Sequence, residues 1–71
     1  MDFDIGALLL DHFKDFDTTH LLLSTYGYSV NRTAVYQWFY RKAVPAHWLG
    51  VLLALREVQD GAPISLTKYL R

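Results

Sequence analysis

The strongest fold signals of the chain lie between Leu21 and Leu55, in the stretch LLLSTYGYSVNRTAVYQWFYRKAVPAHWLGVLLAL. Its apolar residues recur at helical spacing in three runs, which a glycine and a proline separate. Gly27 is typical of the residue that follows a helix, and Pro45 is tolerated in a first helical turn but not in a helix interior. The stretch therefore predicts three successive helices. We expect them over residues 17–26, 31–42 and 46–60.

The ends of these helices carry further signals. Asn31 is a favourable N-cap for the second helix, and Gly61 follows the third. Arg41 and Lys42 place positive charge in the last turn of the second helix, where the helix dipole favours cations. The candidates for the N-cap of the helix expected over 17–26 are Asp17, Thr18 and Thr19.

One more helix is expected before this stretch and one after it. Residues 4–16 place apolar side chains on one helical face, with Asp4 as N-cap; they are Ile5, Leu8, Leu9, Phe13 and Phe16. In the tail, residues 62–71, Pro63 prevents the preceding helix from continuing. We favour a short helix of one turn, capped by Ser65 and running through Leu66, Tyr69 and Leu70, with a strand over 64–66 as the alternative. The fold class predicted is all-α, with four to five helices in a single domain over residues 1–71.

Composition restricts the classes of protein. The chain has 71 residues, of which 52% are hydrophobic and 20% charged, with no cysteine and zero formal net charge. It is too apolar for intrinsic disorder, and disulfides or cysteine metal sites are excluded. Its apolar runs are too short to cross a bilayer, and no signal peptide pattern opens it. We expect a cytoplasmic, nucleoid-associated protein of bacterial or phage type with no membrane partner.

The zero net charge hides an asymmetry along the chain. Residues 1–17 carry five aspartates and one lysine, which gives −4, whereas residues 18–71 carry six cations and two acids, which gives +4. The acidic residues are interpreted as a solvated face, or as a surface that repels DNA from the wrong side of the molecule.

The helix expected over 31–42 has two contrasting faces. Val35, Trp38 and Phe39 form its apolar face. The opposite face contains no carboxylate and consists of side chains that can donate to bases and phosphates: Arg32, Thr33, Tyr36, Gln37, Tyr40 and Arg41. Together with the glycine-containing turn before it, this helix favours a helix-turn-helix motif over about 18–42.

Three elements in this order resemble the lambda-repressor-like and Cro-like family of small phage and bacterial regulators. Ala34 to Trp38, AVYQW, matches the family's "A-V-x-x-W" recognition helix. The basic pair Arg41-Lys42 follows, and then Val44 to Trp48, VPAHW, opens the next helix. The likeness covers about half of the chain. It departs at the turn, which is two residues longer than the common pattern between Gly27 and Val35.

The resemblance implies that the helix enters the major groove of double-stranded DNA and that the protein regulates transcription. Arg32 could then read guanine and Gln37 adenine, while Arg41 and Lys42 contact phosphates. Asn31 is either a cap or a base reader, and the tyrosines either contact DNA or pack against a partner. The DNA-binding candidates are Asn31, Arg32, Thr33, Tyr36, Gln37, Tyr40, Arg41 and Lys42.

A homodimer is expected, because few cations are available per chain and the last long helix is apolar over more than one face. Its inward stripe consists of Trp48, Val51, Leu52 and Leu55. The leucines outside this stripe are covered either by the helix expected over 4–16 or the tail, or by a second copy. The candidate dimer residues are Leu49, Leu53, Leu66 and Tyr69.

Catalysis, metals and cofactors are not expected. His12, His20 and His47 lack the spacing of metal ligands, and no nucleophile motif or glycine-rich phosphate loop is present. The alternative function is a protein-interaction module that uses its tyrosines and leucines to hold RNA polymerase or another regulator, as an antitoxin or antirepressor would.

Overall fold

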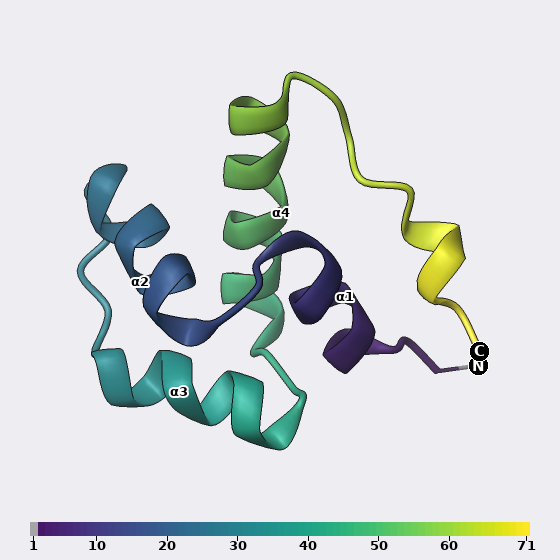
Figure 1. The fold of residues 1–71 in the computed structure, drawn as a ribbon, viewed down its shortest axis with the longest axis horizontal. Coiled ribbons are helices and arrows are strands. Elements are labelled where there is room, and N and C mark those ends of the chain that lie inside the picture. The colour runs from purple at the N-terminus through teal and green to yellow at the C-terminus, as the bar shows by residue number, and fades with distance from the viewer. Residues whose placement is uncertain (1) are drawn as a thin grey trace.

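The computed structural model describes residues 2–71, which form four α-helices and one turn of 3-10 helix. In Figure 1, α4 runs through the middle of the molecule, and α1 and α2 lie on either side of it. Helix α3 lies next to the first turn of α4. Within residues 2–71 there is no strand, only a single β-bridge, so the chain is an all-α domain as predicted. No helix in this part of the chain has the length and apolarity needed to span a membrane. The elements are α1 (Ile5–His12), α2 (Phe16–Thr25), α3 (Arg32–Arg41), α4 (Ala46–Asp60) and η1 (Leu66–Tyr69).

The first helix is shorter than the sequence predicts. Asp4 caps it as expected, accepting a hydrogen bond from the backbone N–H of Ala7 at 3.1 Å. The helix ends at His12 because the chain reverses through Lys14, whose φ of 66° lies in the left-handed region. The prediction that Phe16 ends this helix is wrong, since Phe16 begins α2.

The start of α2 corrects a second prediction. Its N-cap is Asp15, whose Oδ1 accepts from the backbone N–H of Thr18 at 2.8 Å. The predicted caps Asp17, Thr18 and Thr19 all lie inside the helix instead. The predicted end is confirmed, because Gly27 follows the C-cap with a φ of 85°.

The ends of α3 and α4 match their predicted signals. The Asn31 side chain accepts from the Thr33 backbone N–H at 2.8 Å and caps α3. Lys42 ends α3 in the left-handed region with φ 56°. Pro45 immediately precedes α4, and Gly61 ends it with φ 73°.

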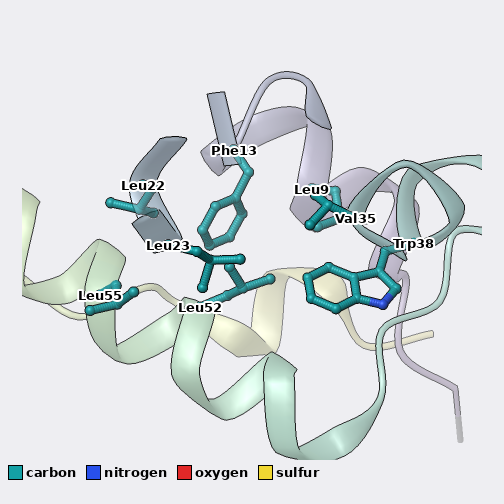
Figure 2. Packing of buried hydrophobic residues seen from close by; sticks show 8 residues of the cluster. All are labelled: Leu9, Phe13, Leu22, Leu23, Val35, Trp38, Leu52 and Leu55. Carbon is teal, nitrogen blue, oxygen red and sulfur yellow. The ribbon is translucent and has the colours of Figure 1, made fainter. Parts of the chain in front are cut away.

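The core takes two residues each from α2, α3 and α4, and Leu9 and the C-cap residue Phe13 from α1; Figure 2 shows them converging. The Phe13 ring lies among leucines of α2 and α4, and Trp38 covers the other end of the cluster. Each fully buried side chain of this size contributes about 1.5–3 kcal/mol. The predicted inward faces are confirmed for Leu9, Phe13, Val35, Trp38, Leu52 and Leu55, which form the buried cluster together with Leu22 and Leu23 of α2.

The tail closes back on the beginning of the chain. The short helix is confirmed in 3-10 form, but it ends at Tyr69, and Leu70 is extended. Ser65 precedes the helix without a side-chain cap hydrogen bond, and the alternative strand over 64–66 is wrong. Phe3 and Leu70 form the antiparallel bridge, and the Arg71 backbone N–H donates to the carbonyl of Asp2 at 2.8 Å. Tyr69 Oη donates to a carboxylate oxygen of Asp11 at 2.8 Å. The tail is therefore part of the folded unit.

Candidate nucleic-acid interface

Helix α3 is anchored by one face and exposed on the other. Val35 is fully buried and Trp38 nearly so, and α3 packs mainly on α2. Arg32, Thr33 and Tyr36 are exposed on the outer face. The helix crosses near the beginning of α4 at the margin of the molecule (Figure 1). A helix held in this way can present its outer side chains to a large partner.

Arg32 is exposed but not free. Its Nε donates to Asp17 Oδ1 at 2.9 Å, and Nη2 pairs with the same oxygen. Its guanidinium carbon lies 5.0 Å from the centroid of the Phe16 ring, which adds a cation–π contact. The side chains of Arg32 and Asp17 are 60% and 62% exposed, so water and ions reach the pair.

An aromatic row continues from this pair along α3. The Phe16 and Tyr36 rings meet edge to face at 5.1 Å, and Tyr36 stacks on Tyr40 at 6.1 Å with an interplanar angle of 18°. Tyr40 is 73% exposed. The two tyrosines therefore form a partly open aromatic surface beside the Arg32–Asp17 pair.

Gln37 and Arg41 lie on another flank of α3. Both line a pocket of about 550 Å³, which the end of α3 forms with the segment Ala43 to Pro45. Trp38 contributes to its apolar wall. Arg41 forms no ion pair with any residue in 2–71, so its guanidinium is available to an anionic partner.

The remaining predicted residues have different surroundings. Asn31 is engaged as the cap of α3, and Thr33 is exposed beside it. Lys42 lies across α1: a Cβ added at Gly6 would come within 2.9 Å of the Lys42 Cδ. The pKa of Asp4 is lowered by the Ala7 backbone N–H first, then by Arg71, and to a smaller degree by Lys42. Lys42 therefore contributes to the α1 end of the molecule as well as to α3.

The structure thus brings Arg32, Tyr36 and Tyr40 together and sets Gln37 and Arg41 apart from them. It also adds Phe16 and Asp17, which the sequence analysis did not assign to this surface. The prediction of a carboxylate-free surface is wrong, because it holds for α3 alone and α2 brings in Asp17. The one sequence signal that could have placed Phe16 and Asp17 on this surface is Asp15, because as the N-cap it puts both residues in the first turn of α2.

The candidate dimer residues are also divided. Tyr69 is only 3% exposed and packs within its own chain, with the His12 ring 5.8 Å from its own. It therefore has almost no surface to offer a second copy, and its assignment to a dimer contact is corrected. Leu49 and Leu53 are half-buried, and Leu66 is exposed.

Comparison of the chain with protein-family models, with curated proteins and with solved structures finds no match in any of the three. The function is therefore inferred from the geometry of the site.

Proposed function

We propose that the chain binds double-stranded DNA through the outer face of α3 and regulates transcription. The observation that carries the proposal is the anchoring of α3 by Val35 and Trp38 while Arg32, Thr33 and Arg41 remain exposed on it. An exposed helix with arginine, threonine and glutamine side chains suits a major groove, where guanidinium and carboxamide groups pair with base edges. The lambda-repressor-like fold remains part of this proposal.

The ion pair of Arg32 with Asp17 does not prevent this role. An exposed ion pair is worth about 0–1 kcal/mol, whereas a good bidentate contact of arginine with guanine discriminates by about 1–3 kcal/mol. The guanidinium can therefore exchange the carboxylate for a base. The carboxylate also restrains the Arg32 side chain before DNA arrives, which reduces the entropy lost on binding.

We further propose that the protein binds as a homodimer on a palindromic or direct-repeat site. A single chain offers few phosphate contacts, and binding strength rises with the number of phosphates neutralised. Two linked copies make the second binding event intramolecular and so increase the affinity.

The experiment is selection of bound sequences from a random duplex library, followed by fluorescence anisotropy with the selected duplex at two salt concentrations. Arg32→Ala is expected to weaken binding by about 1–3 kcal/mol and to relax the preference at one base position. Lys68→Ala removes the same charge from η1 and serves as the matched control. Equal affinities and equal preferences for the two variants would contradict the proposal.

The aromatic row favours a second function, a protein-interaction module. Stacked, exposed tyrosines beside an arginine resemble the composition of protein interfaces. In that case Tyr40→Ala would abolish co-purification of a specific protein, and the chain would ignore the duplex library at every salt concentration.

A further inference from the structure

A second pocket, of about 240 Å³, lies between α2 and the last turns of α4. No residue of α3 lines it, so it is separate from the candidate nucleic-acid interface. Two cationic side chains and an imidazole line it: Lys14 in the turn after α1, Arg56 on α4, and His12 at the end of α1. The ammonium group of Lys14 and the guanidinium of Arg56, which are far apart in the sequence, favour an anion in this pocket.

Arg56 is the unusual member of this group. Its side chain is only 16% exposed, and its guanidinium carbon lies 5.3 Å from the centroid of the Phe13 ring. Its nearest acid is Asp60, at 3.7 Å from Nη1 to Oδ1, which is too long for a hydrogen bond. Nε is buried and has no partner in residues 2–71. Buried guanidinium donors normally have acceptors, so this group lacks the partner that its burial calls for.

Lys14 supplies an exposed positive charge to the lining of the same pocket. The left-handed φ of 66° turns the chain there and keeps its side chain exposed. The neighbouring carboxylate of Asp15 is engaged by the Thr18 backbone N–H. Gln59 adds a carboxamide to the lining, and Thr25 adds a hydroxyl that already donates to the carbonyl of Leu21.

This donor set fits an oxyanion with several acceptor atoms. Guanidinium and ammonium groups both bind phosphate, the first through directed donors and the second as a point charge. The pocket is several times larger than the roughly 30 Å³ share of a water molecule, so it has room for a phosphate group with a small organic substituent.

We propose that this pocket binds a phosphate group, free or as a small monoester, with Arg56 and Lys14 as its cationic donors. Occupation gives the Nη groups of Arg56 the hydrogen-bond acceptor that Asp60, at 3.7 Å, does not provide, and draws α4 and the α1–α2 turn together. The proposal does not depend on DNA binding by α3.

The test is titration of the ¹⁵N-labelled chain with inorganic phosphate at constant ionic strength, with chloride as the balancing anion. Saturable shifts are expected at the amides of Lys14 and Thr18 and at the side-chain Nε–H of Arg56. Lys14→Asn removes the charge with a residue that tolerates the left-handed region, and should weaken phosphate binding about tenfold. Lys68→Asn, which removes a charge outside the pocket, should leave the phosphate affinity unchanged.

A second variant covers the buried cation. Arg56→Met keeps an unbranched chain over Phe13 and removes the guanidinium, so it should abolish the rise in melting temperature that phosphate gives to the parent chain. A phosphate response that persists in this variant at full strength would overturn the proposal.

Two further titrations separate the sources of phosphate. Glycerol 3-phosphate should reproduce the shifts of inorganic phosphate. Shifts of the pocket residues with a DNA duplex, but with neither small phosphate, would overturn the proposal and assign the pocket to the DNA backbone. Phosphate binding by a chain that binds no duplex would refute only the proposed function of α3.

Discussion

At the scale of single residues, Arg32 is held by two neighbours from α2, the carboxylate of Asp17 and the ring of Phe16. The carboxylate has two effects on a DNA-binding arginine. It orders the guanidinium, and it competes with the base or phosphate that would replace it. Because the pair is exposed, the competition is weak and open to measurement.

Removing the charge of Asp17 tests this competition. Asp17→Asn is expected to tighten duplex binding about two- to fivefold, since an exposed ion pair is worth up to about 1 kcal/mol and a negative charge next to the phosphates is lost. Anisotropy titrations measure the change, with Glu57→Gln on α4 as a control of equal charge. Weaker binding by Asp17→Asn than by the control would mean that the carboxylate positions Arg32 more than it competes for it.

Arg41 has no acidic partner within residues 2–71 and should act as a phosphate contact. Arg41→Ala should weaken binding to every duplex alike and lower the slope of log K against log salt by about 1. Affinities for the selected and an unrelated duplex across a salt series provide the measurement. A loss confined to the selected duplex would instead make Arg41 a base reader.

At the scale of elements, the boundary between α1 and α2 places Phe16 and Asp17 next to α3. The N-cap contact of Asp15 with Thr18 fixes where α2 begins. The pKa of Asp15 is lowered chiefly by the Thr18 backbone N–H, because the ionised carboxylate accepts that hydrogen bond.

Asp15→Ala should lower the melting temperature by about 5 °C, as expected for the loss of one cap in a domain of this size. Asp15→Asn keeps a cap acceptor and should recover most of the loss. Because the folded pKa of Asp15 lies below its ordinary value of 3.8, its contribution is present above that pH and is lost as the pH falls through the lowered value. Thermal melts between neutral and acidic pH test both points, and an alanine variant as stable as the parent would refute the role of the cap.

At the scale of the whole molecule, contacts between distant parts of the chain reduce the charge asymmetry seen in the sequence. Asp4 pairs with Arg71, and Asp17 pairs with Arg32. Each pair joins the acidic segment 1–17 to the basic segment 18–71. The folded chain therefore has less separation of charge than its sequence suggests. Within residues 2–71, positive charge without an acidic partner is confined to individual side chains such as Arg41.

The closure of the tail on α1 centres on Tyr69. Burial, and then the hydrogen bond and charge of Asp11, raise the pKa of Tyr69 to about 12. A group whose folded pKa lies above its ordinary value of 10 contributes stability that is complete below pH 10 and is lost as the pH rises through about 12.

Tyr69→Phe should therefore cost about 1 kcal/mol of unfolding free energy near neutral pH, the contribution of a typical hydrogen bond. It should also flatten the loss of stability above pH 10. Urea unfolding at neutral and alkaline pH measures both effects, with Tyr26→Phe as a control at an exposed tyrosine. Parallel alkaline profiles for the two variants would exclude Tyr69 as the group responsible.

The all-α class, the ends of α3 and α4, and the buried faces of α1, α3 and α4 could be predicted from local sequence patterns. These follow from local rules, namely the capping by Asn31, the position of Pro45 and the helical spacing of Val35 and Trp38. These rules predict structure from sequence because each involves residues within a few positions of one another.

The surroundings of Arg32 and the burial of Tyr69 depend on how distant parts of the chain pack against one another. The chain reverses at Lys14 in a left-handed conformation, which lysine rarely adopts and which its sequence context does not predict. The predicted start of α2 was therefore wrong. Asp17 lies 15 positions from Arg32, and Asp11 lies 58 positions from Tyr69. Such pairings depend on how the helices pack around a shared core, and no local pattern encodes the packing of one helix on another.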